Sequence, residues 1–342
     1  MFKKVFKIFS IFIFFIFIVV FSNAFIDVQD KLKLELMEGY PKWLKDEFQH
    51  SDQTSGITFI GKFDNKKLFI IVDDIGAIYY LYIDKNENYS LKKIEIKGEA
   101  IKKLQLFAKM DFEDVVYDKY DKKLYVSIEG NHNNYLDEVG VYEFIFRDDN
   151  ILSGEIIDIK KIEIKPKGKI LEFVQNNIGF EGVTVDKKYF YLGLEGFQVG
   201  KLFADSTYIY IVDKKTKEII KRVSTKKYKI GTICGLVSLK DKELLGVDRN
   251  AGKIFKIQFD DKFNIVFYDE TNIPIQIPKY SNYLYVAAIE SITVDDDNFV
   301  YCIDDPWKSF YIPPNFILKN LDDETKNYFK QYIPIIYKFN MK

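Results

Sequence analysis

The chain has 342 residues, and its 50 lysines and arginines nearly balance 51 aspartates and glutamates, so the formal net charge is −1. The charges are interspersed and form no basic block or stripe, so the sequence gives no support for nucleic-acid binding. The 24 tyrosines and 31 phenylalanines suit a protein made of many strands.

The first 24 residues have the pattern of a secretory signal peptide. Three lysines precede an apolar run over 8–21, and Ala24 ends a small-x-small cleavage site. The alternative is a retained anchor, but the run is shorter than the ~20 residues of a spanning helix. We therefore expect export to the periplasm or outside the cell, cleavage after Ala24, and no stable membrane insertion. Residues 25–342 would then form a single domain.

A repeated unit occupies most of the remaining chain. Its clearest copies are FEDVVYD (112–118), FEGVTVD (180–186) and IESITVD (289–295), each followed by a second apolar strand that ends in an acid. Weaker copies begin near residues 55 and 234. Such a unit, repeated in a strand-rich sequence, predicts an all-β protein of the β-propeller class.

Each copy reads as four strands, which we call a to d from the central channel outward. The sequence therefore predicts five four-stranded blades, at about 55–98, 112–165, 180–225, 234–270 and 289–340. A sixth blade is the alternative. It would have to come from the connections at 147–179 or 261–288, and neither supplies four clean strands.

The last copy lacks an outer strand. The segment 31–37 resembles strand d of the first copy, so it can pair with the last blade and close the ring, which removes free sheet edges. A long insertion, from Pro306 to about Pro334, interrupts the last copy. Within it, 321–332 reads as a short helix with Asn320 as a candidate N-cap.

Acidic residues recur at two positions of the repeat. Strands a and b are antiparallel with a short turn, so the start of a and the end of b lie side by side at one rim of the channel. The acids at the starts of a are Glu113, Glu181 and Glu290, and those at the ends of b are Asp73, Glu129, Glu195, Asp248 and Asp304.

Carboxylates gathered so closely cannot all ionise without compensation. Two alternatives stay open: backbone amides hold them as a structural ring, or they bind a hard cation, for which Ca²⁺ fits best because it takes six to eight oxygen ligands. The candidate metal ligands are Glu113, Glu129, Glu181, Glu195, Glu290 and Asp304.

The connections between strands b and c emerge at the same rim. If the site is catalytic, we expect Glu181, Glu195 and His132 to act in catalysis, His132 as a proton shuttle. The candidate substrate-binding residues are Arg249, Lys201 and Trp307. Phe310 and Tyr311 accompany Trp307, and the three either line a site or pack the insertion onto the rim.

Two family resemblances rest on these residues. The segments NNIGFEGV (176–183) and YLGLE (191–195) resemble the family named for the esterase-like activity of phytase. Together with IESITVDDDNFVYCIDD (289–305) and the unit around LLGVDRNAGKIFKI (244–257), they also resemble the SdiA-regulated family of exported bacterial propellers. The likeness covers most of the chain after residue 24. It implies a propeller outside the cytoplasm, a calcium site and, for the first family, phosphoester hydrolysis.

Two functions of different classes follow. The first is a calcium-dependent hydrolase of phosphoesters or other esters. The second is a non-catalytic propeller that binds a small molecule, a glycan or a protein, in which calcium is structural. We expect a monomer. Cys234 and Cys302 either form a disulfide or remain buried thiols.

Overall fold

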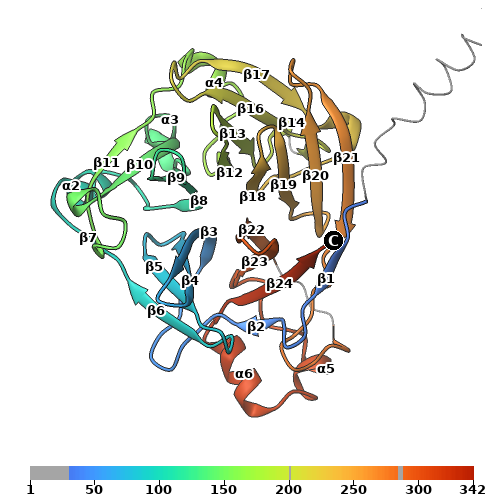
Figure 1. Cartoon of the computed structure of the whole chain (residues 1–342). Coiled ribbons are helices and arrows are strands. Elements are labelled where there is room, and N and C mark those ends of the chain that lie inside the picture. Colours follow the sequence, from blue (N-terminus) through green and yellow to red (C-terminus); the bar gives the residue numbers. More distant parts are fainter. Residues whose placement is uncertain (1–30, 200–201, 284–287) are drawn as a thin grey trace, which may run out of the picture. The chain divides into compact units, whose positions relative to one another are not determined.

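The computed structural model describes residues 31–199, 202–283 and 288–342. The predicted signal peptide and Lys201 therefore lie outside the described residues. Within residues 32–342, five small sheets are arranged in a ring as the blades of a β-propeller, and the strands inside each blade pair antiparallel (Figure 1). This confirms the all-β, five-bladed fold that the repeats predict. No helix among the described residues is long and apolar enough to cross a membrane.

In blades one to four the strands follow one another in chain order from the inner strand outward, and in blade five the strands β22, β23 and β24 do so. They are β3 (Thr54–Phe63), β4 (Lys66–Asp73), β5 (Ile78–Ile83) and β6 (Tyr89–Lys93) in blade one; β8 (Phe112–Asp118), β9 (Lys123–Ile128), β10 (Gly140–Phe146) and β11 (Glu155–Lys161) in blade two; β12 (Phe180–Val185), β13 (Tyr189–Leu194), β16 (Tyr208–Asp213) and β17 (Ile219–Ser224) in blade three; β18 (Gly235–Lys240), β19 (Glu243–Asp248), β20 (Lys253–Phe259) and β21 (Ile265–Asn272) in blade four; and β22 (Ala288–Val294), β23 (Phe299–Asp305) and β24 (Ile335–Met341) in blade five.

The N-terminal strand closes the ring as predicted. β1 (Leu34–Leu36) pairs antiparallel with β24 and supplies the missing outer strand, and β2 (Lys42–Trp43) pairs with the other end of β24. The outer strand expected at the end of the first blade (55–98) is interrupted instead, and β6 ends at Lys93. Its end forms β7 (Glu95–Ile96), which leaves blade one and pairs in parallel with β11 of blade two.

The connections carry the remaining elements. These are α2 (Gly98–Leu104), η1 (His132–Asn134), α3 (Tyr135–Glu138), η2 (Arg147–Asp149), α4 (Lys167–Ile170), the hairpin β14 (Gln198–Val199) and β15 (Leu202–Phe203), η3 (Lys226–Tyr228), α5 (Asn315–Leu318) and α6 (Asp323–Lys330).

The helix predicted inside the last blade is α6, which lies beside α5 and the fifth blade (Figure 1). Its N-cap is Asp322, because the Asp322 side chain accepts a hydrogen bond of 2.6 Å from the backbone N–H of Thr325. Asn320, the predicted cap, instead donates its side-chain amide to the carbonyl of Phe316.

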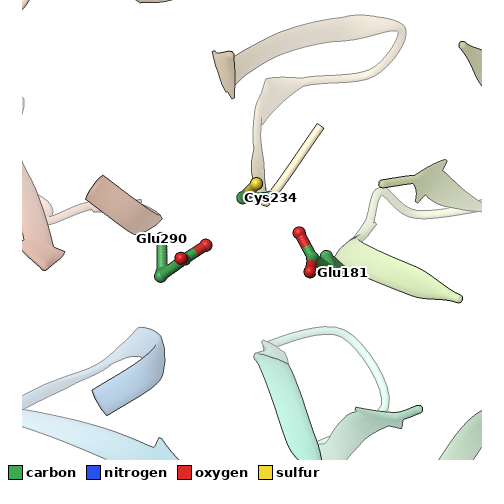
Figure 2. Close-up of side chains that lie close together, drawn as sticks. All are labelled: Glu181, Cys234 and Glu290. Atoms are coloured by element: carbon green, nitrogen blue, oxygen red, sulfur yellow. The ribbon is translucent and has the colours of Figure 1, made fainter. Parts of the chain in front are cut away.

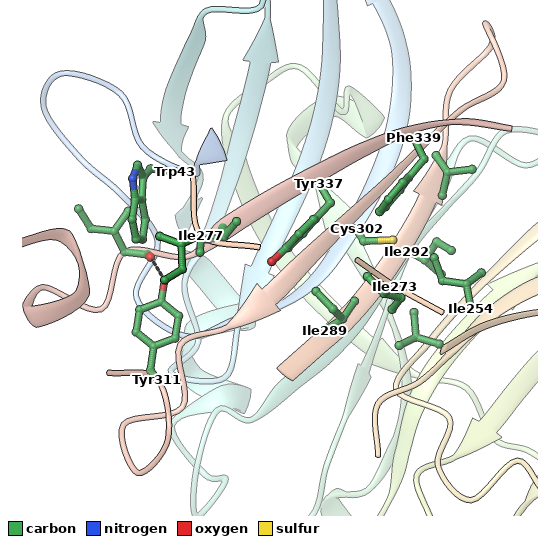
Figure 3. Packing of buried hydrophobic residues seen from close by; sticks show 14 of the residues in the cluster. Trp43, Ile254, Ile273, Ile277, Ile289, Ile292, Cys302, Tyr311, Tyr337 and Phe339 are labelled. Atoms are coloured by element: carbon green, nitrogen blue, oxygen red, sulfur yellow. Dashed lines mark hydrogen bonds between the residues drawn. The ribbon is translucent and has the colours of Figure 1, made fainter. Parts of the chain in front are cut away.

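The insertion packs onto blade five through its apolar side chains. Tyr311 is 2% exposed, its ring contacts Phe329, and its hydroxyl donates to the carbonyl of Ile333 (Figure 3). Tyr311 therefore belongs to the core, whereas Trp307 and Phe310 are 53% and 57% exposed. Cys302 lies in the same core, and both it and Cys234 are buried free thiols.

Candidate functional site

A β-bulge at the start of the inner strand redirects an acidic side chain in three blades. The strand pairing shifts register across Glu113, Glu181 and Glu290. A bulge leaves a residue unpaired and re-aims its side chain. Cys234, just before β18, stands at the corresponding position in blade four. Figure 2 shows Glu181, Cys234 and Glu290 pointing into the same space, and one ligand atom from each lies within 4.8 Å of the others.

Two glutamates that follow the ends of strands b join this arrangement. One oxygen each from Glu129, Glu181 and Glu195 lies within 4.8 Å of the others, and the same holds for Asp111, Glu113 and Glu129. Glu129 therefore belongs to two oxygen-only groups. Asp111, which precedes β8 in the connection between blades, was not predicted.

Aspartates at the ends of strands b do not join these groups. Asp73 accepts a hydrogen bond from the backbone N–H of Ala77, Asp248 accepts one from Gly231, and Asp304 accepts one from Ile335. Asp304 therefore lies outside the three close groups of possible ligands, and its role as a metal ligand stays a prediction. The reason is local: the short carboxylate is held by the backbone of the next segment.

Asp73, Asp248 and Asp304 belong to blades one, four and five, and in each of these blades the next residue in the sequence interacts with the acidic groups. These residues are Asp74, Arg249 and Asp305, where blades two and three have glycine. Burial, together with the nearby carboxylates of Glu290 and Asp74, raises the pKa of Asp305 to about 8. Asp74 and Asp305 were missed, although the doubled charges VDD and IDD, in contrast to IEG and LEG, were a usable signal.

We call the resulting set the mouth cluster. Its acidic members are Asp74, Asp111, Glu113, Glu129, Glu181, Glu195, Glu290 and Asp305.

Arg249 is held inside this cluster. Its guanidinium forms ion pairs with Glu195 at 2.5 Å, with Glu290 at 2.6 Å and with Glu181 at 3.7 Å, and 24% of its side chain is exposed. Lys109 pairs in the same way with Asp111, and with Asp74 at 3.3 Å. The predicted substrate-binding role of Arg249 stays a prediction, and its described contacts are internal.

Burial is the main electrostatic influence on the cluster. It raises the pKa values of Glu113, Glu129, Glu181 and Glu195, and neighbouring carboxylates raise them further. Arg249 opposes the rise for Glu181 and Glu195. Among the described residues, Glu129 Oε1 is buried without a hydrogen-bond partner, and Glu129 is 2% exposed. The site thus holds more buried carboxyl groups than its two cationic side chains can compensate.

Two further predicted residues lie outside the three close groups of possible ligands. His132 is exposed at the start of η1, and Trp307 is exposed in the blade-five insertion, where its ring lies 4.7 Å from that of Phe310. Their catalytic and substrate-binding roles remain predictions.

Asp114, beside Glu113, has a structural role that was not predicted from the sequence. Its carboxylate accepts hydrogen bonds from the backbone N–H groups of Val183 and Leu236 at 2.9 and 3.4 Å, and from the Ser291 hydroxyl at 2.7 Å. The Ser291 hydroxyl oxygen in turn accepts from the N–H of Ile57 at 3.1 Å. This network connects all five blades.

The aspartate that ends each strong copy of the repeat also has a structural role. Asp186 accepts hydrogen bonds in the turn after β12 and from Lys242 of the next blade. Asp118 and Asp295 likewise form ion pairs with lysines of neighbouring blades, Lys214 and Lys67. The two acids of the motif therefore have different roles: the glutamate belongs to the close acidic groups and the aspartate connects neighbouring blades.

No protein-family profile and no curated protein sequence matches the chain. Solved structures match it at low identity. The PQQ-bound aldose sugar dehydrogenase from Streptomyces coelicolor is 6% identical with a TM-score of 0.47, over 91% of this chain and 99% of that one. The GH43_1 enzyme from Xanthomonas citri complexed with xylose is 9% identical with a TM-score of 0.49, over 88% and 89%.

The WD40 repeats of RRP9 are 8% identical with a TM-score of 0.43, over 91% of this chain and 100% of that one. Likenesses this distant say nothing about chemistry. The propeller assignment rests on the strand pairing of this chain, and any function has to be argued from its own residues.

Proposed function

We propose that this protein is an exported propeller that binds a divalent cation, calcium in the first place, in the mouth cluster. The observation that carries this proposal is the surplus of buried carboxyl groups, together with the unpartnered oxygen of Glu129. Buried charges need a counter-charge or hydrogen-bond donors. Lys109 and Arg249 supply both for part of the cluster only.

The donor set fits calcium. The two groups that share Glu129 offer only carboxylate oxygens, which hard cations prefer and which Ca²⁺ accepts in flexible arrangements. The third group includes Cys234, but burial raises the pKa of that thiol well above its usual range, so it is a poor ligand. The residues that would hold the cation are Glu113, Glu129, Glu181 and Glu195, with Asp111 beside them.

Calorimetric titration of the purified protein with Ca²⁺ and Mg²⁺ tests the proposal. Extracellular calcium modules bind with Kd values of about 10⁻⁴–10⁻³ M, and we expect a value in or below this range. Glu129→Gln should weaken binding, whereas Glu99→Gln, an exposed carboxylate on α2, should not. Absence of binding at millimolar Ca²⁺, with a melting temperature that chelator leaves unchanged, would overturn it.

One observation favours hydrolysis as a second candidate. Glu181 and Glu195 lie close together, and burial raises the pKa of each. A carboxyl pair that keeps a proton near neutral pH offers a general acid beside a general base. A bound divalent cation would supply Lewis-acid polarisation of an ester oxygen.

The two candidates separate in a turnover assay. An anionic phosphoester meets a negatively charged mouth, so we expect phosphoester hydrolysis to need added Ca²⁺, and hydrolysis of a neutral p-nitrophenyl ester to need it less. Glu181→Gln should abolish both. If no ester or phosphoester turns over while Ca²⁺ binds, the protein is the non-catalytic propeller.

A further inference from the structure

A separate cavity of about 140 Å³ lies between blades two and three. β10, β11, α3 and α4 contribute to its lining on one side, and β12 and β13 on the other. These elements are neighbours in the ring (Figure 1). Its walls include the buried apolar side chains of Val139, Val141, Ile170, Phe180 and Leu192. No acid of the mouth cluster lines it.

Lys161 is a partly buried cation in the lining of this cavity, which also includes the acidic residues Asp137 and Glu163. Lys161, at the end of β11, donates a hydrogen bond from its ammonium group to the carbonyl of Asp137 at 2.5 Å, and it lies 5.5 Å from the ring centroid of Tyr142. It forms no ion pair with a carboxylate of the described residues. The Asp137 carboxylate pairs instead with Lys167, and both of those side chains are exposed.

The backbone beside Lys161 leaves room for this side chain. A Cβ added to Gly140 would lie 2.9 Å from Cε of Lys161, so glycine lets the lysine stem lie against the start of β10. Burial lowers the pKa of Lys161 to about 8, although the nearby carboxylates of Glu163, Asp137 and Glu138 oppose this shift.

We propose that this cavity binds a small amphipathic carboxylate of about the size of benzoate. The apolar part would lie on Val139, Ile170 and Phe180, and the carboxylate would accept a charge-assisted hydrogen bond from Lys161. The size is consistent with this class, because an apolar protein cavity of about 150 Å³ accommodates benzene. This inference does not depend on the cation site.

Titration of the full-length protein with benzoate, followed by calorimetry or NMR, tests the inference, with benzyl alcohol as the uncharged probe. Lys161→Met should weaken benzoate binding roughly tenfold or more and leave benzyl alcohol binding nearly unchanged. Lys167→Met removes an exposed lysine from the same rim, and it should change benzoate binding only slightly.

A third variant keeps the test valid if Lys161→Met does not fold. Ile170→Phe fills the cavity and should abolish binding of both probes, while the circular dichroism spectrum stays that of a β-protein. The proposal is overturned if benzoate does not bind, if it binds no tighter than benzyl alcohol, or if Lys161→Met and Lys167→Met behave alike.

Discussion

The hydroxyl of Ser291 in blade five donates a 2.7 Å hydrogen bond to the carboxylate of Asp114 in blade two. The two residues are separated by 177 positions in the sequence, and blade one lies between their blades in the ring. Asp114 also accepts from backbone N–H groups of blades three and four. A single buried carboxylate thus holds the inner strands together beside the mouth cluster.

Replacement of this carboxylate should be costly. Asp114→Ala leaves the N–H groups of Val183 and Leu236 and the Ser291 hydroxyl without their buried acceptor, so we expect a loss of about 2 to 5 kcal/mol in the free energy of unfolding. Urea denaturation measures it. Ser291→Ala removes one donor and should cost less, about 1 kcal/mol. Equal losses for the two variants would show that Asp114 is not the hub of the network.

The counter-charge of Arg249 leads to a prediction about calcium. Arg249→Met leaves Glu181, Glu195 and Glu290 buried without their cationic partner, which should destabilise the protein by about 3 to 5 kcal/mol in the presence of chelator. If the cluster binds Ca²⁺, saturating Ca²⁺ should recover part of that loss, because a ligand that binds only the folded state stabilises it.

Melting temperatures of the wild type and of Arg249→Met, each measured with chelator and with Ca²⁺, test whether Ca²⁺ recovers the lost stability. The matched control is Arg147→Met, which removes an exposed ion pair with Glu155 and should cost at most about 1 kcal/mol in either condition. A Ca²⁺ effect that is the same in Arg249→Met as in the wild type would argue against a cation site next to this guanidinium.

The repeat allowed the fold and the bulged glutamates to be predicted, because both recur with the period of the blades. The choice between consecutive acids could not be predicted in this way. Asp304 and Asp305 look alike in sequence, but the N–H of Ile335 from a distant segment binds Asp304, and Asp305 is left to interact with Glu290. Lys109 and Asp111 escaped notice because they lie in a connection between blades, where no repeat marks them.

The role of Asp114 could not be predicted from the sequence either. An acid directly after Glu113 looks like one more charge of the rim, since the neighbouring copies have glycine or serine there. Its role as a hydrogen-bond acceptor for several blades is explained only by the close approach of the inner strands. A Cβ on Gly235 would lie 2.7 Å from Cα of Ser291, and one on Gly56 would lie 2.9 Å from Cα of Asp114. At that spacing the side chain of Asp114 can contact three other blades.

Asp73 gives a prediction about pH. Burial, together with the nearby carboxylates of Asp74 and Asp52, raises its pKa to about 7 from an ordinary value near 4. The folded state therefore binds this proton more tightly than the unfolded state does. The stabilisation it contributes is complete below about pH 4 and is lost as the pH rises toward 7.

Asp73→Asn should remove this pH-dependent contribution to the free energy of unfolding. The amide keeps an oxygen that can accept from the N–H of Ala77, but it carries no charge. Relative to the wild type, the variant should gain stability between pH 4 and pH 7, by roughly 1 to 4 kcal/mol at the upper end. Denaturant unfolding across this range measures the difference, with Asp64→Asn in the exposed turn after β3 as the control. A difference between Asp73→Asn and wild type that stays constant with pH would mean that Asp73 is already ionised in the folded protein at pH 4.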